Sequence, residues 1–442
     1  MTTEVASPTK FQRGRRGKNL ALLTGSTAMD NAESSMTSVM FPLMREAMGL
    51  SSAALGTIVA VSKAVGVFTA IPWAFLARRY SRKSVLAVCS GFWGIWVILA
   101  GLSSNFTQFL VLYAIGAAGF AGAGAIALSI LGDLYEDSRR GRATGLVYGG
   151  VAIITGVSAP VFGLLSRFED GWRYGYITTG GICIVIGVLI MIFLDDPKPT
   201  DENPQPTVDQ LGTKAKLWRA GIRELLAIKT FRYILIQRIF SGQNVIMSFS
   251  IVFLVEEHGF TTTTASIIAP PFAIGYLAGT FVGGRVNDAV HVMRPRSGRI
   301  LMLQASQLGF ALAALVATQI SWNSIGVYAA VFAIVGVLQG QVPVVNRPII
   351  MAVVPPELRA LAFAVSLSTV EALAYAGYAF LVGILGDRIG LQGALFIVTV
   401  VLTAVNGVAS GALYRPYARD SASLLTASVN PLSDQNAHSE IR

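Results

Sequence analysis

Charged residues are scarce in this chain, and cysteine and histidine are scarcer still. Only 13% of the 442 residues are charged, whereas 53% are apolar, which is more apolar sequence than one water-soluble core can bury. The composition therefore indicates a membrane protein. The two cysteines, Cys89 and Cys183, both fall inside apolar runs, so the sequence provides neither a disulfide framework nor a cysteine metal site. Both are expected to be packing residues.

The chain also lacks the marks of an enzyme. His258 and His291 flank apolar runs, His438 lies in a polar tail, and no nucleophile motif or nucleotide-binding loop is present. We therefore expect no catalytic residue, no metal site, no cofactor and no use of ATP. The net charge of +10 could indicate a nucleic-acid partner, but the basic residues lie mainly in the tails, the linker and alternate loops, which favours a membrane orientation signal instead.

Apolar segments of about 20 residues, the length that crosses a bilayer core, recur along the chain. Six precede a proline-rich, acidic break at residues 195–209, and six follow it. The first segment contains acidic residues and is too long for a cleaved signal peptide, so we expect it to be retained. The expected membrane helices are residues 20–41, 55–76, 85–102, 109–131, 145–165, 174–194, 234–255, 265–286, 300–320, 325–353, 361–385 and 394–413.

These segments predict an all-α membrane protein with twelve transmembrane helices in two six-helix bundles. The linker between the bundles is expected to contain a helix on the membrane surface, because its apolar residues share one helical face. Those residues are Leu211, Trp218, Ile222 and Leu226. The expected parts are a basic tail (1–19), the first bundle (20–194), the linker (195–230), the second bundle (231–414) and a polar, serine-rich, disordered tail (415–442).

Basic residues are concentrated on one side of this topology. Lys and Arg are frequent in both tails, in the linker and in the loops on the same side, and rare in the other loops. An excess of basic residues in short loops marks the cytoplasmic side of a membrane protein. We therefore expect a multi-pass protein of the inner (cytoplasmic) membrane, with both termini in the cytoplasm, that acts as a monomer in the lipid bilayer.

A short basic turn joins the second and third segments, where residues 73–86 read WAFLARRYSRKSVL. It resembles the G-x-L-A-D-R-x-G-R-K loop of the major facilitator superfamily, with Ala74, Arg78 and Ser81 in place of Gly, Asp and Gly. The G-x-x-x-D core of that loop returns at residues 284–288, an offset of 210. This repeat predicts an internal duplication into two pseudo-symmetric halves. The resemblance implies the major facilitator fold and transport by alternating access.

Within that superfamily, mainly the first 175 residues are similar to spinster-like proteins. The similarity rests on residues 79–83, 91–93, 102–106, 132–135 and 139–142. That group usually carries D-x-x-R in its first helix, where this chain has Asp30 and Glu33. Spinster-like proteins are associated with lysolipids and other amphiphiles, so the resemblance implies a substrate of this kind.

Ionisable residues inside the predicted helices indicate where transport chemistry takes place, because a charge in hydrocarbon is costly unless it has a partner or faces water. Asp30, Glu33 and Glu371 are the expected proton-coupling residues. Polar and basic residues at helical spacing are expected to line a central cavity and bind the substrate. They are Ser26, Thr37, Lys63, Gln237, Arg238, Ser241, Asn244, Gln339, Gln341, Asn346, Arg347, Tyr375 and Tyr378.

Two of these assignments have an alternative. Glu33 and Lys63 also fit a structural ion pair between adjacent helices. Arg347 precedes Pro348, which removes a backbone hydrogen bond from the helix. Arg347 is therefore expected either to contact the substrate or to support the interrupted helix.

The altered basic turn changes the charges at the predicted cytoplasmic gate. In the superfamily, the Asp of this loop faces the amino end of helix eleven, whose dipole favours a negative charge. Arg78 would meet that end unfavourably unless an acidic residue receives it. The expected pairs are Arg78 with Glu357, Arg82 with Asp133, and Asp288 with Arg139 or Arg140. We expect the first two pairs to act as latches that favour an outward-open state.

The sequence thus predicts a proton-coupled secondary transporter that exports an amphiphilic or lipid-like molecule, such as a lysolipid or a drug. Residues 155–163 favour export, because they resemble the G-x-x-x-G-P-x-x-G motif associated with exporters of the superfamily. Uptake of a small organic anion by Lys63, Arg238 and Arg347 is an alternative. A transporter-like membrane sensor is another.

Overall fold

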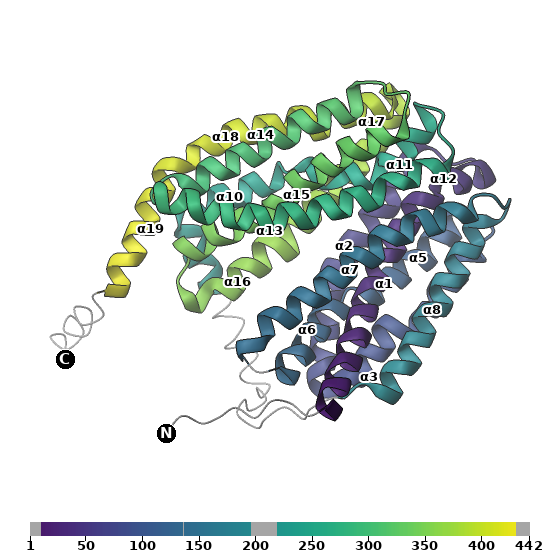
Figure 1. Ribbon diagram of the computed structural model, residues 1–442, viewed down its shortest axis with the longest axis horizontal. Coiled ribbons are helices and arrows are strands. Elements are labelled where there is room, and N and C mark those ends of the chain that lie inside the picture. Colours follow the sequence, from purple (N-terminus) through teal and green to yellow (C-terminus); the bar gives the residue numbers. More distant parts are fainter. Residues whose placement is uncertain (1–9, 136, 196–218, 430–442) are drawn as a thin grey trace.

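The computed structural model describes residues 10–135, 137–195 and 219–429, and the side chains of residues 10–16, 30, 78, 137–142, 360 and 425–429 lie outside that description. Every regular element within the described ranges is a helix. The helices form two bundles, coloured purple to blue and teal to yellow in Figure 1. The all-α fold predicted from the sequence is confirmed.

The first bundle contains six membrane passes. Its third and fourth passes are each assembled from shorter helices, and the third includes a π-helical turn, η1. The elements are α1 (Lys10–Met48), α2 (Ser52–Arg79), α3 (Arg82–Ala87), η1 (Val88–Phe92), α4 (Gly94–Gly101), α5 (Phe106–Phe120), α6 (Ala123–Leu134), α7 (Asp137–Leu165) and α8 (Gly171–Phe193).

The second bundle also contains six passes, and its helices are interrupted more often. A sharp bend at Gly390 (φ 80°) inside α17 separates the eleventh pass from the twelfth. The elements are α10 (Lys229–Ile239), η2 (Gly242–Val245), α11 (Ile246–Glu256), α12 (Thr262–Ala265), η3 (Ser266–Ile268), α13 (Ala269–Met293), α14 (Gly298–Gln319), α15 (Ile325–Val353), η4 (Pro356–Leu358), α16 (Arg359–Phe363), η5 (Ala364–Glu371), α17 (Ala372–Leu395), η6 (Phe396–Val401), α18 (Leu402–Ala409) and η7 (Ser410–Leu413).

Ten stretches of the described residues are long and apolar enough to cross a membrane. The last of them, residues 361–424, contains the bend at Gly390 and so provides two passes. α1 supplies the remaining pass, although its polar and acidic residues make it less apolar than the others. The helix expected at 325–353 has those bounds, whereas α1 extends beyond both ends of the expected 20–41 because helices continue past their apolar run.

The eighth and tenth passes approach each other so closely that side chains would not fit between them. Gly275 of α13 lies against the backbone carbonyl of Ala333 in α15, and Gly340 of α15 lies against the backbone of α13. A Cβ added at Gly279 would overlap the carbonyl oxygen of Val337. Small residues at these positions let the two helices pack backbone to backbone, where many dispersion contacts hold them together.

We expect Gly279→Ala to lower the thermal stability of the purified protein. The added methyl group overlaps the carbonyl of Val337, so α13 and α15 must separate, and overpacking of this kind costs about 1 to 3 kcal/mol. Thermal unfolding in detergent measures the effect. Gly284→Ala on the same helix is the matched control, because a Cβ there meets nothing within 4 Å. Equal melting temperatures for the two variants would contradict the close packing of α13 on α15.

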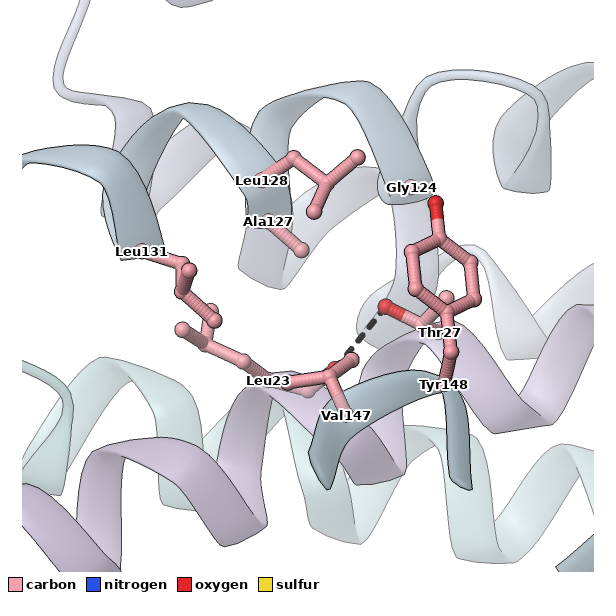
Figure 2. Close-up of a pocket in the computed structure, with 8 residues that line it drawn as sticks. All are labelled: Leu23, Thr27, Gly124, Ala127, Leu128, Leu131, Val147 and Tyr148. Carbon is pink, nitrogen blue, oxygen red and sulfur yellow. Dashed lines mark hydrogen bonds between the residues drawn. The ribbon is translucent and has the colours of Figure 1, made fainter. Parts of the chain in front are cut away.

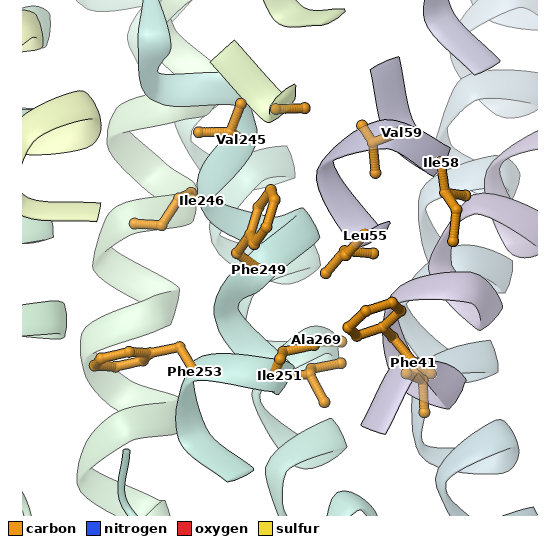
Figure 3. Packing of buried hydrophobic residues seen from close by; sticks show 14 of the residues in the cluster. Phe41, Leu55, Ile58, Val59, Val245, Ile246, Phe249, Ile251, Phe253 and Ala269 are labelled. Carbon is orange, nitrogen blue, oxygen red and sulfur yellow. The ribbon is translucent and has the colours of Figure 1, made fainter. Parts of the chain in front are cut away.

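The two bundles meet at one end of the molecule. We call the end where α1 begins and the twelfth pass ends the terminal face, and the opposite end the far face. The bundles converge toward the far face, near α11 and α12 (Figure 1). Figure 3 shows buried apolar residues of both bundles in one cluster there, among them Phe41 and Leu55 of the first bundle and Phe249 and Ile251 of the second. This cluster closes the far face.

Two polar contacts reinforce the closed far face. Arg45 of α1 forms an ion pair with Glu256 of α11. Asp387 of α17 accepts hydrogen bonds from the backbone N–H groups of Ser52 at 2.6 Å and of Ala53 at 3.1 Å. Asp387 therefore caps the amino terminus of α2 from the other bundle, where the helix dipole also favours its negative charge.

The bundles are apart toward the terminal face. On α7, Gly156 packs against the side chain of Ala273 in α13. Gly149 and Gly145 lie on the same face of α7, two and three turns closer to the terminal face, and a Cβ added at either would meet nothing within 4 Å. The structure is therefore closed at the far face and open toward the terminal face.

Residues 219–227 of the linker form a helix at the terminal face. Leu225 is 1% exposed and packs in the second bundle, whereas Leu226 is 41% exposed. Gly221 lets this helix approach α16, because a Cβ added there would lie 2.8 Å from Leu361. Two of the apolar residues expected on the surface helix, Leu211 and Trp218, lie outside the described residues.

The chain after the twelfth pass differs from the expectation. Residues 415–429 belong to α19 (Tyr414–Val429) and not to a disordered tail, and residues 430–442 lie outside the described residues. Asp420 accepts hydrogen bonds from the backbone N–H of Thr230 at 2.8 Å and from its hydroxyl at 2.7 Å, and Tyr417 is 1% exposed. These contacts cap α10 and hold α19 in place, which a polar composition does not reveal.

Candidate functional site

A buried ion pair lies in the second bundle, between the seventh and eleventh passes. Nη1 of Arg238 is 2.9 Å from Oε2 of Glu371, and the side chains of the two residues are 2% and 25% exposed. A buried charge without a partner is costly, so each group depends on the other. The sequence predicted both residues at the site, and the structure brings them together.

The backbone of both helices is irregular at this pair. α10 ends at Ile239, the chain leaves helical geometry at Ser241 (φ −92°, ψ 74°), and the 3₁₀ turn η2 follows. Glu371 is the last residue of η5, an eight-residue π-helix. Irregular backbone inside a membrane is tolerated where it is buried in protein or lines a cavity, and it often marks the binding site of a transporter.

Hydrogen bonds extend the ion pair across the second bundle. Nδ2 of Asn244 donates to Oε1 of Glu371 at 3.2 Å. Nε2 of Gln339 in α15 donates to Oδ1 of Asn244 at 3.1 Å. The central network therefore consists of Arg238, Glu371, Asn244 and Gln339, from the seventh, tenth and eleventh passes. Because these partly buried links are continuous, a change of charge at Glu371 acts on all three helices.

Tyr375 lies beside the central network and faces the first bundle. It lies four residues after Glu371, and its hydroxyl is 2.6 Å from Oγ of Ser248. Nζ of Lys63 in α2 lies 5.5 Å from the centre of the Tyr375 ring, which is within the range of a cation–π contact. Lys63 thus brings a positive charge from the first bundle to the site. Its ion pair with Glu33 stays a prediction.

The polar face of α1 lies inside the first bundle in this conformation. Ser26, Glu33 and Thr37 are 0%, 2% and 1% exposed. Oγ1 of Thr37 is 2.8 Å from the hydroxyl of Tyr176, and the hydroxyl of Ser26 donates to a carbonyl of its own helix. These two hydroxyl groups are therefore bonded within the first bundle, away from the central network. The side chain of Asp30 lies outside the described residues.

Arg347 is exposed, and the helix interruption beside it is satisfied by another residue. Pro348 has no N–H to donate to the carbonyl oxygen of Val344. Nδ2 of Asn287 in α13 donates to that oxygen at 3.3 Å. The carbonyl freed by Pro348 is therefore bonded by Asn287, and both expected roles of Arg347 stay predictions. The other predicted binding residues are buried or half-buried in the second bundle: Gln237, Ser241, Gln341, Asn346 and Tyr378.

One of the expected gate pairs is present among the described side chains. Arg82 of α3 forms an ion pair with Asp133 of α6, and Nη1 of Arg82 also lies 3.2 Å from the hydroxyl of Ser129. The pair joins two helices of the same bundle and is formed while the terminal face is open, and its role as a latch stays a prediction. Asp288 and Glu357 are exposed, and the side chains of Arg78, Arg139 and Arg140 lie outside the described residues.

The first bundle presents a narrow apolar notch between α1, α6 and α7, shown in Figure 2. The hydroxyl of Thr27 donates to the carbonyl oxygen of Leu23 at 2.9 Å, so its polar group is satisfied within α1. The notch does not admit a water-sized sphere, and it is therefore part of an apolar wall and no binding pocket. Its lining residues are Leu23, Thr27, Gly124, Ala127, Leu128, Leu131, Val147 and Tyr148.

Within the described residues, twelve membrane passes in two bundles, with a buried ion pair at helix breaks in the second bundle, are the arrangement of a membrane transporter. A comparison with protein families matches residues 23–288 and 235–430 to the Major Facilitator Superfamily. The chain therefore belongs to this family, whose members transport molecules and are not enzymes, as its basic turn and its duplication indicated.

Two relatives illustrate how far the sequence similarity extends. A probable 4-methylmuconolactone transporter of Cupriavidus pinatubonensis is 27% identical over 173 residues, which are 38% of this chain and 39% of that protein. Protein spinster homolog 1 of Xenopus laevis is 24% identical over 192 residues, which are 43% of this chain and 36% of that protein. The chain thus spans less than half the length of either relative in these matches.

Similarity at the level of structure covers nearly the whole chain. A bacterial homologue of the human lysosomal transporter Spinster, in an inward-facing and unoccupied conformation, has a TM-score of 0.75 and 20% identity. The match covers 95% of this chain and 99% of that one. This likeness confirms the major facilitator fold. Spinster proteins therefore occur in both comparisons, in agreement with the resemblance of the first 175 residues.

Proposed function

We propose that this secondary transporter moves an amphiphilic or lipid-like molecule by alternating access, with the two bundles rocking about the central network. The observation that carries the proposal is the Arg238–Glu371 pair, which is buried at breaks in two helices of the second bundle. Maintaining a buried ion pair beside irregular backbone is costly, so such an arrangement is expected where its charges take part in transport.

The two sides of the central region differ in chemistry, which favours an amphiphile. The second bundle supplies Arg238, Glu371 and the exposed Arg347. The first bundle supplies Lys63 and the apolar wall between α1, α6 and α7. A molecule with a charged head and an apolar chain would place its head against the second bundle and its chain along the first. The likeness to spinster proteins supports the same class of substrate.

Glu371 is the proposed proton carrier of the central network. An anionic group of the substrate would take the place of the Glu371 carboxylate on the guanidinium of Arg238. After the substrate has left at the far face, the Glu371 carboxylate would accept a proton from the solution there. It would release that proton at the terminal face when the ion pair with Arg238 forms again, so the proton and the substrate move in opposite directions. Asp30 and Glu33 in α1 are proposed as further carriers.

We infer that the terminal face lies in the cytoplasm of a cell with an inner membrane. Basic side chains are frequent there, as the positive-inside rule requires for the cytoplasmic side. The structure then corresponds to an inward-open state. Export would begin with loading of this state from the cytoplasm or from the inner leaflet.

A small organic anion is the second candidate substrate. Arg347 is exposed and its charge acts on Arg238, and Lys63 adds a third positive charge from the first bundle. Three cationic groups around one carboxylate give a positive region, which favours an anion regardless of whether it carries an apolar chain.

Flux measurements in proteoliposomes test the proposed function. The vesicles are loaded with a lysolipid and a panel of amphiphiles, with and without an imposed pH gradient. We expect gradient-driven movement by the wild type and a loss of about tenfold or more in Asp30→Asn, as for removal of a group that transfers a proton. Glu46→Gln is the matched control, because Glu46 is exposed at the far end of the same helix.

Each other result changes a specific part of the proposal. Movement without a pH gradient would identify a facilitator, and proton coupling would no longer be part of the proposal. Transport of small anions in place of amphiphiles would favour the second candidate and the three cationic residues. No flux of either class would favour a transporter-like sensor.

A further inference from the structure

Four amide side chains form a buried layer inside the second bundle, which we call the amide layer. Gln237, Gln307, Asn346 and Asn406 come from the seventh, ninth, tenth and twelfth passes and are 4%, 0%, 0% and 4% exposed. Each lies between seven and nine residues from the end of its pass at the terminal face. At the rise of an α-helix this is about 10 to 14 Å, so the four residues lie at the same depth.

Direct contacts place three of the four amides next to one another. Nδ2 of Asn406 donates to the backbone carbonyl of Gln237 at 3.1 Å, which joins the twelfth pass to the seventh. A Cβ added at Gly407 would lie 3.2 Å from Cβ of Gln307, which places the ninth pass against the same turn of the twelfth. Gln237 and Gln307 therefore flank one turn of α18.

The position of Asn346 along its helix places this fourth amide at the same depth as the other three. The seventh and tenth passes are antiparallel, and Gln339 of α15 bonds to Asn244 of η2. Along α15, which is one helix over this range, Asn346 lies seven residues, or about two helical turns, closer to the terminal face than Gln339. Because seven residues return to the same helical face, Asn346 also faces the seventh pass, and its distance from the end of its own pass places it at the depth of Gln237.

Most polar atoms of the amide layer have no hydrogen-bond partner among the described residues. Both amide atoms of Gln237, Gln307 and Asn346 are unpartnered, and so are Oγ1 of Thr403 and Nε of Arg238. Buried polar groups in folded proteins are almost always bonded, and an orphaned group costs about 1 to 3 kcal/mol. Six such atoms in the layer, with two more on residues that neighbour it along the chain, indicate that the layer holds a polar ligand.

Apolar residues seal the amide layer on both sides. Ile234 and Leu303 lie on the side of the terminal face, and Phe310 and Val398 lie on the side of the far face, and all four are 0% exposed. A ligand enclosed in this way must be small and must exchange its hydration shell for the side chains of the layer. An ion of the size of chloride, or water, meets this condition.

We propose that the amide layer binds a monovalent anion of the size of chloride. Arg238 follows Gln237 directly in the chain and is 2% exposed, and its Nε is unpartnered while its Nη1 pairs with Glu371. Amide, hydroxyl and guanidinium groups together supply N–H and O–H donors, which suit an anion. A cation in the same place would be repelled by the guanidinium.

Such an anion gives Arg238 a second counter-charge. If Glu371 accepts a proton during transport, the buried guanidinium would otherwise lose its partner. With an anion in the amide layer, Arg238 stays compensated from inside the bundle, and Glu371 can leave it. This consequence for transport rests on the proposed function, whereas binding of the anion does not.

Anion-dependent stability tests the binding. Thermal unfolding of the purified protein is compared in chloride and in gluconate at equal ionic strength. We expect a melting temperature that is higher in chloride by roughly 5 °C at saturating anion, because a ligand that binds the folded state stabilises it by mass action. Crystals grown with bromide should show an anomalous peak between the seventh, ninth, tenth and twelfth passes.

Two variants of the ninth pass make the test specific. Gln307→Leu removes two unpartnered atoms from the amide layer, so it should fold and should lose the chloride effect. Gln304→Leu is the control, because Gln304 lies one turn away and donates to the carbonyl of Gly407 at 3.2 Å, and it should keep the effect. Equal wild-type stability in the two anions, a chloride effect that persists in Gln307→Leu, or a layer filled by water alone would overturn the proposal. A negative result of this chloride test would not change the flux expected in the proteoliposome measurement, so the two proposals are tested separately.

Discussion

Glu371→Gln should destabilise the protein more than Arg238→Met does. Arg238 is 2% exposed, so loss of its carboxylate partner leaves a buried charge unpaired, at a cost of about 3 kcal/mol. Glu371 is 25% exposed and keeps its hydrogen bond from Asn244, so loss of the arginine costs only about 1 kcal/mol. Thermal unfolding in gluconate buffer gives the comparison without a halide that could compensate Arg238.

The double variant Arg238→Met/Glu371→Leu separates stability from function. Replacing both members of a buried ion pair with apolar residues of similar size is often neutral for folding. We therefore expect the double variant to melt close to the wild type and to be inactive in flux measurements. If instead Arg238→Met is the most destabilised of the three variants, the assignment of the arginine as the dependent member of the pair is wrong.

Asp387→Ala should shift the conformational equilibrium toward a state that is open at the far face. The substitution removes the cap that joins α17 to the amino terminus of α2, and a cap with its dipole contribution is worth about 1 to 2 kcal/mol. A difference of that size changes the ratio of two states by roughly 5- to 30-fold. Spin labels at positions 107 and 324, which are exposed at the far face of the two bundles, report the change as a longer-distance population.

Asp170→Ala is the matched control for this variant. Asp170 also lies at the far face, but its partner is Arg173 of the same bundle, three residues away. Its removal should leave the distance distribution unchanged. An Asp387→Ala protein with the wild-type distribution would mean that the apolar cluster alone closes the far face.

The sequence predicted the membrane passes well because each pass needs a long apolar run, and such runs are visible in a single chain. It could not predict the interruptions. The π-helix η5 and the break at Ser241 depend on packing between helices, such as the contact of Gly242 with Val398, which lies far away in the chain. Local composition does not contain that information.

The sequence predicted which residues belong to the candidate site, but it did not predict which of them contact one another. A charge in a predicted membrane helix identifies Arg238 and Glu371 individually, but their pairing follows from the arrangement of the seventh and eleventh passes. Asp387 was missed, although it offered a signal. It is an acidic residue in the last turn before a helix bend, where the helix dipole disfavours it, so its presence there indicates a partner outside its own helix.

The glycine contacts between α13 and α15 limit how the second bundle can deform. Two helices that touch along their backbones cannot tilt or slide against each other without losing those contacts, so the eighth and tenth passes form one rigid unit. The irregular segments η2 and η5 belong to the seventh and eleventh passes, which are not part of that unit. We therefore expect the seventh and eleventh passes to bend at these irregular segments during transport, while the rigid unit keeps its shape. Arg238 and Glu371 are located at the two bending points.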